Sequence, residues 1–583
     1  MGGTPAERRE SAQDMLRGVD RTRVMAAAMA VAAVLAALAP ARAHPGHGCA
    51  ETRADRWAEA SGVEDPTGEV RVYAIQFKHE IRHVRSHQTF DRKMRCLVEE
   101  LVMPTADVDG DGRADEPTIV VLNEDAGLAT IAAGTRGVPA RAAAARGVKD
   151  PRNIPGALSA FATLGASYQP AVSYYAARAP ETSAQRLILA AATDNFVRGF
   201  MRTNSAIARD YGVYVVSSNN QAEFRETTDP VAVAALRDPD YVEAYLDGTL
   251  TSVYEAVDVG PDPSDPSSTT GMGRAGIDVY NQAFMWAPED APAGHPVRTR
   301  HEEINGGPLS PDDPRRNIIH LTRKTPLTSI EREVLDLSDD RDMGELNTGP
   351  LCLLPADDPS CSIRIGYGIS LPAFQWGSAF GEQLPNGIEP CSTPTLWMRC
   401  LDARGVNLFL QPEANPGKWA DYIDLSWTPT AFQALSWMDS AWRTVADPTV
   451  ENIRYAVTPH LVGNLVDLTF DGQSVIFERC FMSGDGSTCD GNTPEAFVGA
   501  ELFVACGPGE TARCDGPELA PYAGAKQETI VMAPWVLDDD PALSPVMNRE
   551  RLAERARQME AGTGSPFEND YLETAVWADL DFD

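Results

Sequence analysis

Residues 118–128 read TIVVLNEDAGL, a short apolar run that ends on the polar residues Asn123 and Glu124. An apolar run of this length is typical of a buried strand. Residues 70–77, VRVYAIQF, form a second strand candidate, and a helix is predicted between the two strands over about 90–102. This strand–helix–strand order predicts α/β layers around a shared sheet.

The alternation continues through the rest of the chain. A long helix is predicted over 183–211, and it leads directly into a strand over 213–216. Further predicted elements are strands at 278–286, 317–322, 362–369, 406–411, 453–459 and 473–478, and helices near 395–404 and 430–445. Two stretches rich in Pro, Asp, Ser and Gly, 257–274 and 339–361, are interpreted as loop insertions.

The charge balance narrows the range of partners. The chain of 583 residues carries 84 Asp and Glu against 50 Lys and Arg, a formal net charge of -34. A field of that sign repels phosphate backbones and anionic lipids, so neither nucleic acid nor a membrane surface is an expected partner. Hydrophobic residues make up 43% of the chain, which is ordinary for a folded, soluble protein. The sequence leaves the oligomeric state open.

The N-terminal region resembles an export signal. Residues 25–39 form an apolar run, MAAAMAVAAVLAALA, that follows several arginines and precedes the small-x-small pattern of residues 41–43. This arrangement is typical of a secretory signal peptide, and the run is too short to span a bilayer comfortably. We therefore expect a signal peptide over 1–43, a mature N-terminus near His44 and an N-terminal segment over 44–67. The predicted location is secreted or periplasmic.

Ten cysteines agree with export. Eight of them form close neighbours in the sequence: Cys352 and Cys361, Cys391 and Cys400, Cys480 and Cys489, and Cys506 and Cys514. In an oxidising compartment such pairs favour local disulfides, and Cys49 with Cys96 would form a fifth. Free buried thiols are the alternative, because connectivity does not follow from spacing alone. With five disulfides, no cysteine would remain as a nucleophile.

Several segments follow one another in a familiar order. They read VRVYAIQF, VVLNEDAGL, YGVYVVSSNN, VYNQAFMWAPED with NIIHLTRKTPL, IRIGYGIS, GVNLFLQPEANPGKW, ENIRYAVTPHLVGN with DGQSVIF, and TAVWADLDF. This order resembles that of the nitrilase superfamily of carbon–nitrogen hydrolases, over about 68–583. The resemblance implies an α/β fold, a nitrilase-type α-β-β-α sandwich. It would be a single domain with loop insertions at about 257–274, 339–361 and 480–572.

The resemblance also implies roles for particular residues. In the family a glutamate is the base, a lysine stabilises the tetrahedral intermediate and a cysteine attacks, as hydrolysis of an amide or nitrile requires. Glu124 matches the base, although the family usually has Pro-Glu where this chain has Asn123-Glu124. Lys324 matches the lysine. A supporting glutamate often follows it, and either Glu331 or Glu333 could take that place.

The nucleophile position departs from the family pattern. Counting four residues from Gly366, as the family motif does, leads to Ser370 instead of a cysteine. A thiol has a pKa of about 8.5, whereas a serine hydroxyl is a much weaker acid and needs stronger activation. Two hypotheses follow. The chain is a hydrolase of a non-peptide amide or nitrile C–N bond, without a catalytic cofactor, or it is an inactive homologue that keeps the fold for binding.

A third hypothesis is a zinc metallopeptidase. His79-Glu80-Ile-Arg-His83 matches the H-E-x-x-H pattern, in which a helix places both histidines on one face and the glutamate acts as base. Glu99 or Glu100 would supply a third ligand. The flanking residues are basic, where a buried zinc helix is usually apolar, so we rank this hypothesis last.

A calcium loop is predicted between the first two strands. Asp107, Asp109, Asp111, Arg113 and Asp115 occupy alternating positions, with glycines that allow the turn. Carboxylate oxygens at this spacing suit a hard cation, and Arg113 would offer only its backbone carbonyl. The loop lacks the glutamate at the twelfth position of a full EF-hand loop, so it resembles the shorter calcium loops of extracellular proteins. A solvated acidic turn without a cation is the alternative.

The cysteine pattern makes a prediction about the mature protein. We expect the chain to begin near His44 and to carry five disulfides, because export places its ten cysteines in an oxidising compartment. Intact-mass measurement before and after reduction would show both features. A majority of the cysteines titrating as free thiols in the exported protein would contradict the prediction.

Overall fold

The computed structural model divides the chain into two units, Met1–Gly48 and Cys49–Asp583. The described residues all belong to the second unit, so the predicted signal peptide lies outside them. The structure describes residues 49–54, 56–149, 156–241, 250–258, 276–353, 361–379, 381–414, 422–423, 431–432, 440–441, 443–447, 449–465, 468–470, 472–479, 527–533 and 572–582.

The first sheet has seven strands. Their order is β1 (Ser61–Val63), β20 (Thr574–Leu580), β2 (Val70–Gln76), β4 (Thr118–Val121), β5 (Tyr214–Ala222), β8 (Val279–Trp286) and β9 (Ile318–Arg323). Strands β2, β4 and β5 run parallel, and β8 and β9 form an antiparallel hairpin beside them. The strands predicted from 70–77 to 317–322 are therefore confirmed. Strand β1 precedes residue 68, so the compact unit begins earlier than the resemblance implied.

The second sheet has six strands. Their order is β10 (Leu351–Cys352), β11 (Arg364–Tyr367), β12 (Leu408–Leu410), β15 (Tyr455–Thr458), β18 (Val475–Arg479) and β19 (Gln527–Met532). Strands β11, β12 and β15 run parallel. The edge strands β10 and β19 lie inside the predicted insertions 339–361 and 480–572. The composition of these stretches does not indicate a strand. An edge strand is held by backbone hydrogen bonds to its one neighbour, and residue composition does not reveal such bonds.

The two sheets pack against each other through alternate residues of their strands. On β2, Val72 and Ala74 share one core with Ile365 and Leu408 of the second sheet. Residues on the opposite face of β2, including Tyr73, pack in another core with helices α3 (His87–Leu101) and α10 (Arg202–Tyr211). Both faces of β2 are buried, as a central parallel strand requires.

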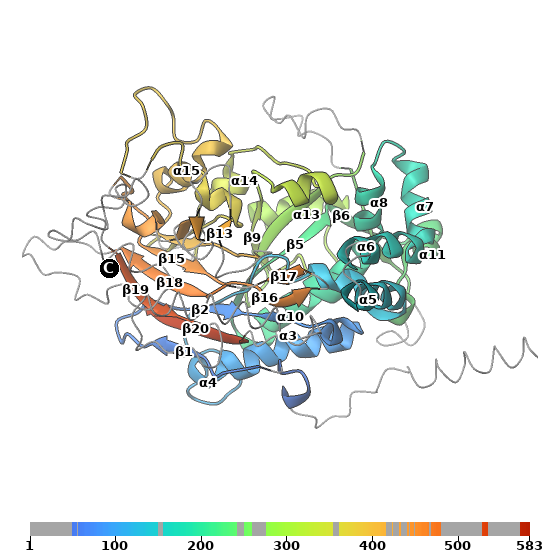
Figure 1. The fold of residues 1–583 in the computed structure, drawn as a ribbon, viewed down its shortest axis with the longest axis horizontal. Coiled ribbons are helices and arrows are strands. Elements are labelled where there is room, and N and C mark those ends of the chain that lie inside the picture. The colour runs from blue at the N-terminus through green and yellow to red at the C-terminus, as the bar shows by residue number, and fades with distance from the viewer. Residues whose placement is uncertain are drawn as a thin grey trace, which may run out of the picture. The chain divides into compact units, whose positions relative to one another are not determined.

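A helix covers the outer face of the second sheet. Helix α15 (Trp397–Ala403) packs there, and Trp397 Nε1 donates a hydrogen bond of 2.8 Å to the Tyr367 carbonyl of β11. Figure 1 shows α15 on one side of the strands and α3 on the other. The predicted α-β-β-α sandwich is confirmed by these layers.

Two helix predictions need correction. The helix predicted over 183–211 is divided into α8 (Ala184–Ala191), α9 (Thr193–Phe196), one π-helical turn (Val197–Met201) and α10. The helix predicted over 430–445 is wrong at its start, where β14 (Ala431–Phe432) pairs with β13 (Tyr422–Ile423). Residues 440–441 and 443–446 are helical as predicted.

Smaller elements complete the described part. Figure 1 shows the helices α5, α6, α7, α8 and α11 gathered at one end of the sheets, where they share a core. The remaining elements are α4 (Met103–Ala106), α5 (Gly134–Lys149), α6 (Gly156–Ser167), α7 (Gln169–Arg178), α11 (Pro230–Leu236), α13 (Pro296–Asn305), α14 (Glu345–Thr348), β3 (Lys78–His79), β6 (Phe224–Thr227), β7 (Val253–Ala256), β16 (Val462–Leu465) and β17 (Leu468–Phe470).

Three of the predicted disulfides are present. They join Cys49 to Cys96, Cys352 to Cys361 and Cys391 to Cys400. The pairs Cys480–Cys489 and Cys506–Cys514 lie outside the described residues. Within the described ranges, no helix is long and apolar enough to cross a membrane.

Candidate active site

The predicted site residues lie just beyond the C-terminal ends of strands. Glu124 follows β4, Lys324 follows β9 directly, and Ser370 follows β11. All three side chains are buried. Parallel strands of one sheet end at the same edge of that sheet. Glu124 therefore lies at such an edge of the first sheet, after β4, and Ser370 lies at one of the second sheet, after β11. The sandwich therefore holds these groups on rigid elements.

Lys324 and Glu124 form the centre of the site. The Lys324 ammonium lies 2.6 Å from Glu124 Oε1 and 3.1 Å from Glu331 Oε2. Asn281, in the middle of β8, donates hydrogen bonds of 2.7 Å to Glu124 Oε1 and 2.7 Å to Glu331 Oε1. One ammonium and one amide therefore bridge the same two carboxylates. Both bridges engage Oε1 of Glu124, so Oε2 is the oxygen that faces neither donor.

The structure distinguishes the two candidates for the supporting glutamate. Glu331 lies in a single π-helical turn, Ile330–Val334, and its Oε2 accepts hydrogen bonds of 2.8 Å from both the backbone N–H and the hydroxyl of Thr328. Glu333 is exposed. Glu331 is therefore the glutamate that meets Lys324. Sequence reasoning left the choice open because a π-helical turn does not follow the 3.6-residue period.

Burial and neighbouring charges shift the pKa values of these three groups in different directions. Burial raises the pKa of Glu124, and the charge of Glu331 raises it further, so the net shift is upward despite the neighbouring Lys324. Burial also raises the pKa of Glu331, but Lys324, Asn281 and Thr328 outweigh it and the net pKa is lowered. Burial lowers the pKa of Lys324, and the two carboxylates reverse this into a net rise. Glu331 and Lys324 are therefore the charged pair, and Glu124 is the weaker acid.

Ser370 has an unusual backbone conformation. Its φ is 55° and its ψ is -107°, a positive φ that is uncommon for a residue other than glycine. The Ser370 N–H donates a hydrogen bond of 3.1 Å to the Pro412 carbonyl, and the Ala373 N–H donates one of 3.0 Å to the Ser370 carbonyl. These contacts hold the chain in a sharp turn between β11 and the 3-10 turn Leu371–Phe374. Strained backbone of this kind is concentrated at functional sites.

Glu413 is a member of the site that sequence reasoning missed. It follows β12 and is completely buried. Burial raises its pKa well above the ordinary range, and Glu124 raises it further, while Gln411, Lys324 and the Ser370 hydroxyl each lower it. The Glu413 carboxyl group is therefore close to both Ser370 and the Glu124–Lys324 pair. The available signal was a charged residue shortly after the apolar strand LFL, in LFLQPE.

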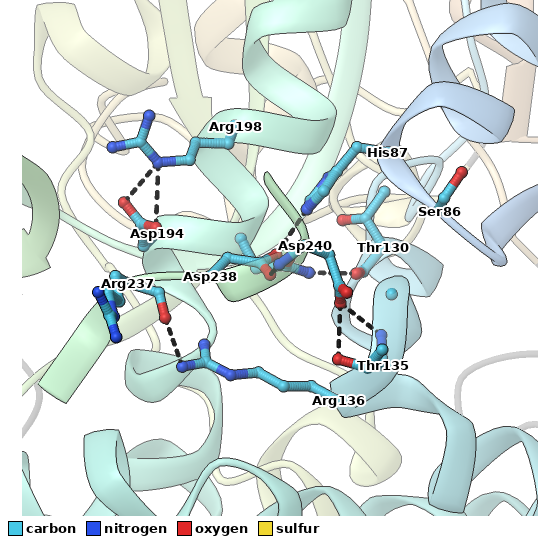
Figure 2. A network of polar contacts seen from close by, with 12 residues as sticks. Ser86, His87, Thr130, Thr135, Arg136, Asp194, Arg198, Arg237, Asp238 and Asp240 are labelled. Atoms are coloured by element: carbon cyan, nitrogen blue, oxygen red, sulfur yellow. Dashed lines mark hydrogen bonds and ion pairs between the residues drawn. The ribbon is translucent and has the colours of Figure 1, made fainter. Parts of the chain in front are cut away.

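The H-E-x-x-H stretch does not form the helix that zinc ligation would require. His79 ends strand β3, and Ile81–Val84 form a 3-10 turn. His87 begins α3, and its Nε2 lies 2.6 Å from Asp238 Oδ2, both groups being buried (Figure 2). Among the described residues, no group of three potential metal ligands includes a histidine. The prediction of a zinc helix is therefore wrong.

The aspartate loop brings only part of the predicted set together. Carboxylate oxygens of Asp107, Asp109 and Asp115 lie within 4.8 Å of one another. Asp111 Oδ1 instead accepts a hydrogen bond of 2.9 Å from the Arg113 backbone N–H. Arg113 turns its side chain away, donating a hydrogen bond of 2.6 Å to the Arg209 carbonyl. The three converging carboxylates also accept backbone N–H bonds within the loop, and they would supply only part of the six to eight oxygen ligands that a calcium ion takes.

Comparison with known proteins gives weak likenesses only. No family model matches the chain, and no curated protein matches it. Similar solved structures include a variant of a nitrilase-superfamily amidase from Nesterenkonia AN1, at 13% identity, covering 70% of this chain and 84% of that chain with a TM-score of 0.28. Another is a carbon–nitrogen hydrolase from Helicobacter pylori G27, at 11% identity, covering 70% and 82% with a TM-score of 0.31. Likenesses this weak leave the chemistry to be deduced from the residues of the chain itself.

The aspartate loop makes a prediction about calcium. We expect one calcium ion at Asp107, Asp109 and Asp115, and binding to the native state alone should raise thermal stability as calcium is added. The measurement is the melting temperature after chelator treatment, with and without millimolar calcium. Asp109→Asn should weaken the response, whereas an unchanged melting temperature in the wild type would count against the site.

Proposed function

We propose that this protein hydrolyses a non-peptide amide or nitrile C–N bond. Glu124 acts as the base, Lys324 stabilises the developing negative charge and Ser370 is the nucleophile. The observation that supports this best is the buried Lys324 ammonium between Glu124, at 2.6 Å, and Glu331, at 3.1 Å. Buried, strongly perturbed groups at strand ends are typical of active sites. The partner is a small-molecule amide or nitrile.

The proposed reaction with an amide has two stages. The Ser370 Oγ attacks the carbonyl carbon, its proton passes to Glu124, and the carbonyl oxygen takes negative charge near Lys324. The C–N bond then breaks, and Glu124 returns the proton to the leaving nitrogen, which leaves an ester on Ser370. Water, deprotonated by Glu124, cleaves that ester and restores the serine hydroxyl. Glu124 serves as base and acid in turn.

A serine nucleophile needs a stronger base than a cysteine does. The raised pKa of Glu124 goes in this direction, because a weaker acid has a more basic conjugate carboxylate. Its Oε1 is engaged by Lys324 and Asn281, which leaves Oε2 to receive the proton. A reactive thiol would also be at risk of oxidation outside the cell, which makes serine intelligible in an exported protein.

The proposal includes export and a structural calcium ion. The three disulfides support an oxidising compartment, since such bonds are rare in the reducing cytosol. A secretory signal over 1–43 would bring the chain there, to a secreted or periplasmic location. The calcium ion would tie Asp107 to Asp115 across the loop that precedes β4.

A second candidate function is binding without catalysis. The observation that favours it is Ser370 itself, since a serine at this position is much harder to ionise than a cysteine. Such a homologue would keep the fold and the Lys324 ion pairs without turning substrate over. The two candidates differ in one measurable property, which is turnover of any C–N substrate by the wild type.

The catalytic unit makes the first functional prediction. On a panel of amides, nitriles and N-carbamoyl compounds, Ser370→Ala and Glu124→Gln should each remove most of the rate, and the double variant should lose little more. Ser370→Cys should keep or raise the rate, because a thiol ionises more easily. Steady-state kcat/KM is the measurement. Turnover that survives Ser370→Ala or Glu124→Gln would show that this is not the site, and an inactive wild type would favour the binding protein.

The pair Glu331 and Glu333 offers a matched test. The base must be ionised, so kcat/KM should fall as pH falls through the raised pKa of Glu124. Because the charge of Glu331 helps to raise that pKa, Glu331→Gln should move this acid limb to lower pH. It should also lower kcat/KM by roughly tenfold or more, since it weakens a charged hydrogen-bond network.

The control for that test is Glu333→Gln. Glu333 is exposed and two residues away, so its variant should change neither the rate nor the pH profile. The measurement is kcat/KM as a function of pH for the two variants and the wild type. Equal effects of the two variants, or an acid limb that moves upward in Glu331→Gln, would contradict the assignment.

A further inference from the structure

Glu413 is held rigidly at the junction of two strand ends. Its backbone N–H donates a hydrogen bond of 3.1 Å to the Pro459 carbonyl, and its carbonyl accepts one of 3.0 Å from the Leu461 N–H. The preceding residue, Pro412, accepts the Ser370 N–H at 3.1 Å. The backbone that carries Glu413 is thus tied on one side to the proposed nucleophile and on the other to the segment after β15.

The two carboxyl oxygens of Glu413 differ in their surroundings. Oε1 accepts a hydrogen bond of 2.5 Å from Gln411 Nε2, and that amide also donates one of 2.6 Å to the Ser440 hydroxyl. By distance and angle, Oε2 has no hydrogen-bond partner in the described part of the chain, although the Ser370 hydroxyl lies near enough to the carboxyl group to lower its pKa. The residue is 0% exposed, so water at the protein surface does not supply a hydrogen bond to this oxygen. A buried polar atom left unpaired in this way costs free energy unless a ligand supplies the partner.

The charges around Glu413 favour its neutral form. Glu124 approaches it from the end of β4 and raises its pKa, in addition to burial, while Lys324 from the end of β9 lowers it. The segment after β15 contributes His460, which forms a backbone bridge with Glu413 and whose pKa is lowered by burial to about 3. This histidine is therefore uncharged at neutral pH. Among the described residues, Lys324 is the cation that acts on Glu413, and it is already shared by Glu124 and Glu331.

We propose that Glu413 is a hydrogen-bond donor to the substrate, a neutral carboxylic acid whose Oε2–H stabilises the developing oxyanion together with Lys324. This rests on the proposed hydrolysis at Ser370. Because Gln411 donates to Oε1, we place the acid proton on Oε2. A carboxylic acid kept neutral by its site can act as an oxyanion donor at neutral pH. The proton is shared in a hydrogen bond and is not transferred, so Glu124 remains the only base.

Two variants of Glu413 separate a donor from a base. Glu413→Gln keeps the shape, stays neutral and places an amide N–H at the position of Oε2, so kcat/KM should fall by less than about tenfold. Glu413→Met removes the donor and should lower kcat/KM by about 10²–10³-fold, the usual cost of one oxyanion donor. Equal, large losses in both variants would indicate proton transfer and overturn the proposal. Full activity in Glu413→Met would overturn it as well.

The pH profile provides a readout that a merely structural role would not move. Activity of the wild type should fall as pH rises through the raised pKa of Glu413, because the ionised carboxylate can no longer donate. Glu413→Gln, which does not titrate, should lack this alkaline limb. A limb that is identical in both proteins would overturn the proposal.

A measurement without substrate separates this proposal from the proposed function. The unfolded chain ionises Glu413 near the ordinary pKa of about 4.3, whereas the folded protein keeps it neutral. Wild-type stability from this group is therefore lost as pH rises from there towards the folded pKa. The stability of Glu413→Gln relative to wild type, from urea unfolding, should grow between pH 4 and 8. Glu333→Gln is the surface control and should show no such trend.

The two failures have different signatures. An absent trend in the unfolding series would show that Glu413 is ionised and would overturn its role as a donor, whatever the enzyme does. A wild type without turnover on any amide, nitrile or N-carbamoyl compound would overturn the proposed hydrolysis, and with it the donation to substrate. Glu413→Gln also guards against misfolding, because it differs from the native side chain by one atom type.

Discussion

One buried ammonium group organises the candidate site. Lys324 is only 3% exposed, so its charge requires carboxylate partners within the fold. Glu124 and Glu331 supply them, and Asn281 bridges the same two carboxylates from β8. Removing either glutamate would leave Lys324 with a single carboxylate partner, and removing Lys324 would leave two repelling carboxylates. The balance joins residues from the ends of β4 and β9, from within β8 and from one π-helical turn.

The same balance gives chemically identical groups different properties. Glu331 meets Lys324, Asn281 and Thr328, and its pKa is lowered. Glu124 meets the same lysine but also the charge of Glu331, and its pKa is raised. Burial raises the pKa of Glu413 well above the ordinary range, and the charge of Glu124 raises it further. In the proposed mechanism one residue type would therefore supply a permanent anion, a base and a neutral acid, because environments that push pKa values apart assign different roles.

The sandwich supplies the rigidity that this arrangement needs. Alternate residues of β2 and β4 pack against the second sheet, and the opposite faces pack against α3 and α10, so the strands have little freedom. A rigid frame also explains how Ser370 keeps a positive φ of 55°, a conformation that costs about 1–3 kcal/mol and persists only where the surroundings over-determine it. The turn at Ser370 is bonded to Pro412, which places the proposed nucleophile beside Glu413. Stability of the sheets and geometry of the site are thus coupled.

The sequence alone determined the elements whose signal is local. Apolar runs such as TIVVL predicted strands because a buried strand must be apolar along its length, and the paired cysteines predicted short disulfide loops. The resemblance also placed Glu124 and Lys324 correctly at strand ends. Only the tertiary structure chose Glu331 over Glu333, brought Asn281 and Glu413 into the site, and paired His87 with Asp238. These residues contact segments that are distant in the sequence. The local sequence shows that a charged residue follows a strand, but it does not show which other buried charge that residue will contact.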